Sequence, residues 1–292
     1  MKNIIEIKDL TKFYGNNRGI NNLSLNIKEG EIFGFVGPNG SGKSTTIRCL
    51  LALIFPTSGS ATIFNKDCIK EASTIANSIG YLPSEVFYYD NMKVKELLDY
   101  SASFYDHDCS KRCDELCKKL NLDVTRKIEE LSFGNRKKVG IVQALLHSPK
   151  LIILDEPTGG LDPLMQQTFF NILREENKKG TTIIFSSHIL SEVQKLCDRV
   201  GIIKEGEIIK IDEVSNITNS TYKHVELVSN DTKAKDILKD SCITNLIIDN
   251  SNIQFSFNGN TNDLIKLLSN LNIKDLTLRE PELEEIFMHY YE

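Results

Sequence analysis

The sequence predicts an α/β core that carries antiparallel strands and an inserted helical subdomain, followed by a small α+β module. Three apolar runs have the composition of strands buried on both faces of a parallel sheet. They are Ile32–Val36, Leu151–Leu154 and Thr181–Ser187. Between the first two, residues 84–146 show mainly helical spacing. After residue 214 the composition shifts to Asn, Ser, Thr and Asp with short strands and helices, one of them predicted over 282–291. We therefore expect domains over 1–214, with the helical subdomain at about 84–146, and over 215–292.

Composition and charge limit the class of protein. Of 292 residues, 40% are hydrophobic and 26% charged, which is ordinary for a globular protein. No apolar run approaches the roughly 18 to 20 residues that cross a bilayer, and we find no cleavage signature, so we expect a cytoplasmic protein. The net charge is −5, and its acidic excess lies after residue 214, which does not favour a nucleic-acid partner.

The seven cysteines show no pairing pattern, which is typical of a reducing compartment. Cys109, Cys113 and Cys117 are spaced four apart, as they would be on one face of a helix. Leucines interleave with them, and no fourth ligand is evident elsewhere. We therefore interpret them as core residues in preference to a metal cluster.

A glycine-rich run follows the first apolar strand and precedes a helical segment. The run is Gly37-Pro38-Asn39-Gly40-Ser41-Gly42-Lys43-Ser44-Thr45. Its glycines let backbone N–H groups turn inward beside a helix N-terminus, which is a geometry that holds phosphates. We expect Lys43 to reach the outer phosphates and the Ser44 hydroxyl to coordinate Mg²⁺. The alternative is a surface turn, but such a turn has no need for Lys and Ser at its exit.

Two carboxylates and a histidine follow the other buried strands. Asp155 and Glu156 come directly after Leu151–Leu154, and His188 follows Thr181–Ser187. Ligands bind beyond the carboxyl ends of strands in open α/β sheets, so these side chains are expected to face the glycine-rich run. We expect Asp155 to hold Mg²⁺, Glu156 to polarise a water, and His188 to contact a terminal phosphate or that water. A purely structural histidine is the alternative.

Other signals are weaker. Ser132 and Gly134 open a helical segment and form a second candidate anion site, although Ser is also a common helix cap. Tyr14 is expected in a loop, where it would either stack on a base or pack. The aromatic run Val86–Tyr89 is either a core plug or a docking surface, and both readings stay open.

In this order and spacing, the motifs resemble those of the ATP-binding subunits of ABC transporters, and in particular the exporter branch of bacitracin- and daunorubicin-type ATPases. The matching elements are Tyr14 as the adenine-stacking aromatic, Gly37–Thr45 as Walker A, Leu131–Asn135 as the signature, Leu151–Glu156 as Walker B, Gly160–Asp162 as the D-loop and His188 as the switch histidine. The resemblance implies a P-loop NTPase core. The tail, residues 283–291, resembles the C-terminal domain of that branch.

The resemblance implies ATP and Mg²⁺ as ligands and a head-to-tail dimer, preferably of identical chains, in which Walker A of one subunit faces the signature of the other. Glu156 would be the general base, His188 would steady the γ-phosphate, and the opposite subunit's signature serine would meet the same phosphate. An integral membrane permease would be the second partner, with the protein peripheral on the cytoplasmic face and powering export. A soluble ABC ATPase, or a module that binds ATP with little turnover, is the alternative.

Two positions depart from the family pattern. Ser84, beside Glu85, stands where the family usually has a Gln that touches magnesium and senses the membrane subunit. In the signature, Phe133 and Asn135 replace a Gly and a Gln, whereas Ser132 and Gly134 are retained.

Overall fold

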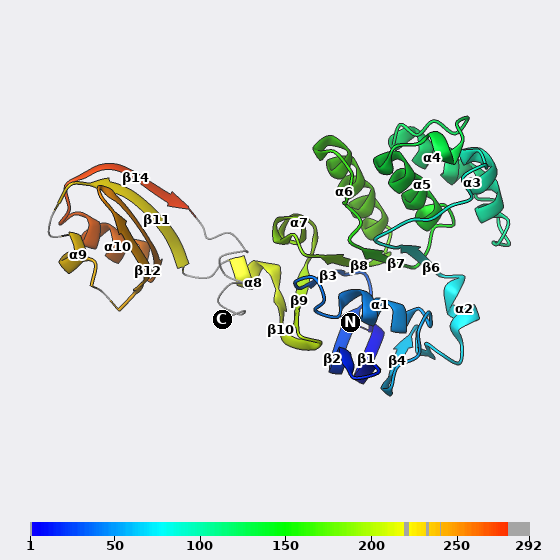
Figure 1. Ribbon diagram of the computed structural model, residues 1–292, viewed down its shortest axis with the longest axis horizontal. Coiled ribbons are helices and arrows are strands. Elements are labelled where there is room, and N and C mark those ends of the chain that lie inside the picture. The colour runs from blue at the N-terminus through cyan, green and yellow to red at the C-terminus, as the bar shows by residue number, and fades with distance from the viewer. Residues whose placement is uncertain (1, 219–221, 232–233, 240, 280–292) are drawn as a thin grey trace. The chain divides into compact units, whose positions relative to one another are not determined.

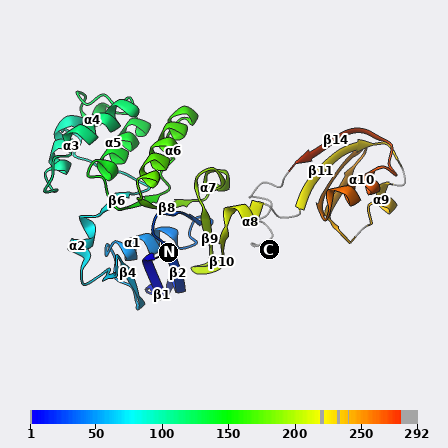
Figure 2. The same cartoon turned by 180° about the vertical axis from the view of Figure 1, so that it is seen from behind.

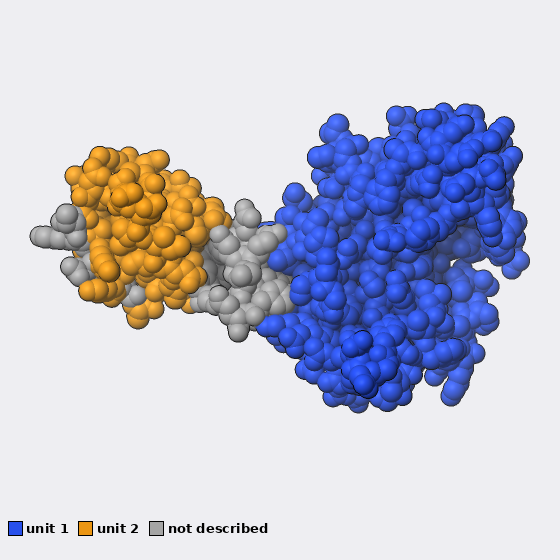
Figure 3. Space-filling model, viewed as in Figure 1, with its two compact units in different colours: residues 1–212 blue, residues 213–292 orange. Residues whose placement is uncertain are grey.

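The computed structural model describes residues 2–218, 222–231, 234–239 and 241–279. The chain divides into two compact units, residues 1–212 and residues 213–292 (Figure 3).

A six-stranded sheet forms the centre of the first unit. In spatial order its strands are β10 (Glu207–Glu213), β9 (Arg199–Lys204), β3 (Ile32–Val36), β8 (Thr182–Ser187), β7 (Leu151–Asp155) and β6 (Ile79–Leu82). The strands from β9 to β6 pair in parallel, and β3, β7 and β8 are buried along their whole length. Their carboxyl ends therefore meet at one edge, which gathers the residues that follow them.

A second, antiparallel sheet lies beside the first. Its strands, in order, are β2 (Asn17–Lys28), β1 (Asn3–Tyr14), β4 (Ser58–Ile63) and β5 (Lys66–Asp67). Helix α1 (Lys43–Leu50) contacts β7 of one sheet and β2 and β4 of the other, and Figure 1 shows it between them. Its Ile47, Cys49 and Leu50 share one apolar core with residues of both sheets. This burial fixes the start of α1 at the sheet edge.

The remaining helices of this unit pack on the six-stranded sheet or form the helical subdomain. They are α2 (Ala72–Ala76), α3 (Val94–Ala102), α4 (Ser110–Lys119), η1 (Ile128–Glu130), α5 (Phe133–Leu145), α6 (Pro163–Lys178) and α7 (Leu190–Leu196). Both views show α3, α4 and α5 as one group beside α6 (Figures 1 and 2). Arg112 of α4 forms an ion pair with the buried Glu176 of α6, which joins the helical group to the core.

The second unit is a small α+β fold with its own core. Its four strands, in spatial order, are β12 (Ile243–Asp249), β13 (Asn252–Asn258), β11 (Tyr222–Ser229) and β14 (Ile273–Arg279), and its helices are α8 (Val214–Thr218), α9 (Ala234–Ile237) and α10 (Thr261–Leu268). Leu264 and Leu268 of α10 pack with Val225 and Phe255 of the sheet. The helix predicted over 282–291 lies outside the described residues.

Two local expectations differ from the structure. Tyr14 ends strand β1 and does not lie in a loop, because β1 continues past irregularities in its pairing near Leu10 and Lys12. The run 86–89, predicted as either a core plug or a docking surface, alternates between partly buried and exposed side chains. Val86 and Tyr88 are partly buried toward α5, whereas Phe87 and Tyr89 are 86% and 68% exposed. The Tyr88 hydroxyl donates to the Arg136 carbonyl at 3.3 Å, and burial raises the pKa of Tyr88.

Candidate functional site

The glycine-rich run links β3 to α1 and forms a tight loop. Gly40 and Gly42 have φ values of 78° and 112°, a region that side chains with a Cβ rarely adopt. Gly37 is required for a different reason, since a Cβ there would lie 2.3 Å from the Ile203 carbonyl oxygen. The loop backbone can therefore curl at the N-terminus of α1, where unpaired N–H groups attract anions.

Lys43 is the first residue of α1, at the end of this loop, and its side chain is almost fully buried. Its Nζ donates to the carbonyl oxygens of Gly37 at 2.7 Å and Pro38 at 3.1 Å, and it lies 3.5 Å from Glu156 Oε1. Burial lowers the pKa of Lys43, and the charge of Glu156 opposes this effect. The ammonium is thus held at the loop by two carbonyl hydrogen bonds and one carboxylate.

Glu156 and His188 meet at the same edge. Glu156 follows β7 with φ of 46°, an unusual value for a residue other than glycine, and its N–H donates to the Ser186 carbonyl at 3.1 Å. His188 follows β8, and its Nδ1 lies 3.3 Å from Glu156 Oε1. Behind it, Ser187 Oγ donates to Glu192 at 2.9 Å and accepts from the Ile189 N–H. The turn that carries His188 is therefore fixed by its own hydrogen bonds.

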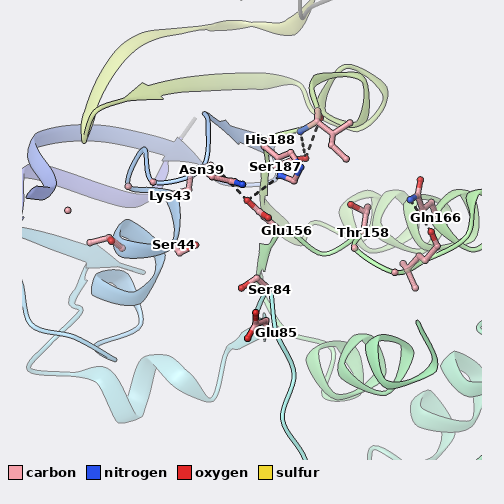
Figure 4. A pocket seen from close by; sticks show the side chains of 18 of the residues that line it. Asn39, Lys43, Ser44, Ser84, Glu85, Glu156, Thr158, Gln166, Ser187 and His188 are labelled. Atoms are coloured by element: carbon pink, nitrogen blue, oxygen red, sulfur yellow. Dashed lines mark hydrogen bonds and ion pairs between the residues drawn. The ribbon is translucent and has the colours of Figure 1, made fainter. Parts of the chain in front are cut away.

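These residues surround a cavity of about 860 Å³ (Figure 4). Nine of the residues predicted from sequence line it: Tyr14, Asn39, Gly40, Gly42, Lys43, Ser44, Thr45, Glu156 and His188. Tyr14 is 45% exposed, so its ring is only partly covered by the protein. Lys12 Nζ lies 5.4 Å from the centre of the same ring. The cavity is large enough for a nucleotide and combines an aromatic ring with an anion-binding loop.

Gly37, Ser41 and Asp155 are not among the residues that line the cavity. Asp155 is 1% exposed, and its Oδ1 accepts a hydrogen bond from Ser186 Oγ at 3.1 Å. Its Oδ2 is buried with no hydrogen-bond partner in the described part of the chain. A buried carboxylate oxygen left in this way is costly unless a cation or water satisfies it. Carboxylate and hydroxyl oxygens, such as those of Asp155 and Ser44, are of the kind that Mg²⁺ prefers as ligands.

Ser132 and Gly134 are also outside the cavity. Ser132 is the N-cap of α5, and its Oγ accepts from the Asn135 N–H at 3.3 Å. Gly134 packs so closely on the segment after β7 that a Cβ there would lie 2.5 Å from the Gly160 carbonyl oxygen. Ser132 and Gly134 are therefore not part of the cavity lining of their own chain, although Gly134 packs on Gly160, which lines it.

The structure adds residues that the sequence did not single out. Arg18, Thr158 and Gln166 line the cavity. Ser84 and Glu85, which the sequence marked as departures from the family pattern, line it as well (Figure 4). The fully buried Lys137 of α5 contacts the backbone on the same side. The position of Arg18 beside a nucleotide loop depends on the long β1–β2 hairpin, so no local pattern marks it.

Comparisons with known proteins identify the family. The sequence profile described as ABC transporter matches residues 20–159. The chain is 34% identical over 300 residues to the bacitracin transport ATP-binding protein BcrA of Bacillus licheniformis, covering 99% of this chain and 97% of that protein. It is 30% identical to the linearmycin resistance ATP-binding protein LnrL of Bacillus subtilis (strain 168), covering 98% of this chain and 97% of that protein.

Solved structures agree with this assignment. One neighbour is the post-hydrolysis dimer of the ATP-binding cassette MJ0796 bound to ADP and Pi, with a TM-score of 0.67 and 28% identity over 72% of this chain and 98% of that chain. The chain belongs to the ATP-binding proteins of the ABC transporter family. The family and the P-loop NTPase fold predicted from the motifs are thereby confirmed. Within the described residues, no helix is long and apolar enough to span a membrane.

Proposed function

We propose that the chain hydrolyses ATP and powers export of a small molecule, peptide or lipid through a separate membrane permease. One observation carries the proposal: Lys43, Glu156 and His188 come from three different strand ends and meet at one edge of the phosphate-loop cavity. The export part is supported by the relatives, whose names refer to bacitracin transport and linearmycin resistance.

Nucleotide binding is assigned to residues of the cavity. The exposed ring of Tyr14 stacks on the adenine, and the N–H groups between Asn39 and Thr45 bind the phosphates. Lys43 exchanges its carbonyl contacts for the outer phosphate oxygens, which carry more negative charge. Mg²⁺ bound through Ser44 and Asp155 would supply positive charge to the phosphate oxygens.

Hydrolysis is assigned to Glu156 and His188. Glu156 accepts a proton from the attacking water, while His188 hydrogen-bonds the γ-phosphate and holds the Glu156 carboxylate in place. Lys43 stabilises the charge that develops on the transferred group.

The site is completed by a second chain. Ser132 and Gly134 lie at the N-terminus of α5, outside the chain's own cavity, and N–H groups at such a terminus favour an anion. In a head-to-tail dimer each α5 terminus closes the partner's cavity over the γ-phosphate. Cleavage of ATP breaks the covalent link between the β- and γ-phosphates, and release of the phosphate then removes the group that joins the two chains.

Coupling to the permease is assigned to Phe87 and Tyr89. Both side chains are exposed on the loop that leads from Ser84 to the helical subdomain. Exposed aromatic residues are common anchors of protein interfaces. The protein would thus sit at the cytoplasmic face of the membrane, held by the permease. Residues 1–214 would form the ATP-binding domain, and 215–292 a C-terminal accessory domain.

The second candidate is a nucleotide-gated dimerisation module with little turnover. Ser84 and Phe133, which replace the usual Gln and Gly of the family, favour it. The two candidates differ in the rate of phosphate release.

The test measures phosphate release by the purified chain with ATP and Mg²⁺. We expect steady turnover, and a decrease of at least about 100-fold in Glu156→Gln, because a positioned general base contributes about 10² to 10⁴ in rate. Glu129→Gln removes an exposed carboxylate of η1 and serves as the matched control. Equal rates in Glu156→Gln and the unaltered chain would remove Glu156 from its role. ATP-dependent dimers without phosphate release would favour the second candidate.

A further inference from the structure

Lys137 is a buried cation in the second turn of α5. Its side chain is completely buried, whereas its neighbour Lys138 is partly exposed. Lysine is almost never fully buried unless its charge is satisfied, because taking an ammonium out of water is costly. Lys137 therefore needs a specific set of partners.

The partners are three backbone carbonyls. Lys137 Nζ donates to the carbonyl oxygens of Ser84 at 2.8 Å, Pro83 at 3.0 Å and Glu156 at 3.3 Å. An ammonium has three N–H donors, so all of them are used. Burial lowers the pKa of Lys137 to about 8, and the negative charges of Asp155 and Glu156 oppose this shift.

The three carbonyls belong to the two segments that leave the sheet at the cavity. Pro83 and Ser84 follow β6, and Glu156 follows β7. Glu156 has a φ of 46°, a strained value that persists only when surrounding groups hold the backbone in place. Lys137 binds the carbonyl of that same residue.

An uncharged residue that fits this position would be buried at a lower desolvation cost than lysine. Replacing buried charges by well-packed apolar groups is often neutral or stabilising. The arrangement therefore points to a need for three aligned donors and not to packing alone.

We propose that Lys137 is a positioning residue, which ties the Glu156 backbone and the Pro83–Ser84 loop to α5. The carboxylate of Glu156, the loop that leads to Phe87 and Tyr89, and the α5 N-terminus that carries Ser132 then move as one body. The catalytic part of this inference rests on the proposed ATPase function. The structural part does not.

The test compares Lys137→Met, which keeps the chain length without donors, with the matched control Lys138→Met. In Lys137→Met we expect faster amide hydrogen exchange in peptides that contain 84–86 and 156–158. We also expect kcat for ATP to fall by at least about tenfold, which corresponds to about 1.4 kcal/mol of transition-state free energy. The KM for ATP is expected to change by less than about twofold. Lys138→Met is expected to match the unaltered chain in both measurements.

The amide of Lys137→Gln retains two N–H donors. Its exchange rates and its kcat are therefore expected to lie between those of Lys137→Met and those of the unaltered chain. It also replaces Lys137→Met in both measurements if that variant does not fold. Unchanged exchange and kcat in the variant measured would overturn the proposal, and so would an equal loss in Lys138→Met. If the unaltered chain shows no ATPase activity, the proposed function fails, and the exchange measurement still decides the role of Lys137.

Discussion

The contact between Phe133 and Gly160 predicts an energetic coupling between the signature segment and the segment after β7. Gly160 has φ of 79°, and a Cβ there would lie 2.2 Å from Phe133 Cδ1 and 2.5 Å from Cε1. Carbon atoms normally approach to about 3.5 to 4.0 Å, so Gly160→Ala must displace the ring. Gly159, Gly160 and Leu161 line the nucleotide cavity, so the displacement is expected to reach the site.

The loss of unfolding free energy expected for Gly160→Ala has two parts. An alanine in the left-handed region costs about 1 to 2 kcal/mol whatever its neighbours are. Phe133 is 56% exposed, so its ring can turn into solvent. The second part is then the lost packing of that ring, about 0.5 to 1 kcal/mol by comparison with other coupled contacts.

A double-mutant cycle separates these parts. We expect Gly160→Ala to lower the free energy of unfolding of the first unit by about 1.5 to 3 kcal/mol alone, and by about 1 to 2 kcal/mol in a Phe133→Ala background. Urea unfolding followed by circular dichroism measures both. Equal losses of unfolding free energy in the two backgrounds would refute the energetic coupling between Phe133 and Gly160.

Three further predictions concern single residues. His147 is buried, its Nε2 lies 3.1 Å from the Ile79 carbonyl, and burial lowers the pKa of His147 from 6.5 to about 4. The stabilisation by neutral His147 is therefore complete above pH 6.5 and is lost as the pH falls toward about 4, by at most about 3 kcal/mol. Urea unfolding from pH 7 to pH 4 checks this, and an unchanged pH dependence in His147→Asn would contradict it. Tyr14→Ala is expected to raise KM for ATP roughly tenfold with little change in kcat, because stacking on a base contributes about 1 to 3 kcal/mol; an unaltered KM would exclude stacking. Asp155→Asn is expected to raise the Mg²⁺ concentration needed for half-maximal hydrolysis at least about tenfold, and the same Mg²⁺ dependence in both proteins would exclude Asp155 as a ligand.

The sequence predicted the sheet edge well because its signals are local. The runs that form β3, β7 and β8 are continuous and apolar, and the residues directly after them reach the cavity by strand geometry alone. The glycine-rich loop was predictable for a similar reason, since Gly40 and Gly42 need φ values that few other residues adopt. The roles of the individual site residues stay predictions.

Residues whose positions depend on tertiary packing were not predictable. Lys137 lies between two other basic residues, a pattern typical of a solvated helix face, and its burial arises only when the segments after β6 and β7 pack on α5. Tyr14 was expected in a loop because it lies between two segments that alternate in hydrophobicity. In the structure β1 continues past Asp9, which has φ of 49°, and Tyr14 pairs with Asn17 of β2. Phe87 and Tyr88 belong to one aromatic run, and only the fold determines which ring faces outward.

The central claim is that two separate phosphate-binding surfaces on one chain form a complete site only in a pair of chains. Sedimentation of Glu156→Gln tests it most directly, with and without ATP and Mg²⁺ and at several protein concentrations. The account predicts a species of twice the chain's mass when ATP and Mg²⁺ are both present, and its loss when Ser132→Glu is added, because a carboxylate at the α5 terminus repels the γ-phosphate. Monomers under every condition, or dimers that form equally without nucleotide, would contradict it.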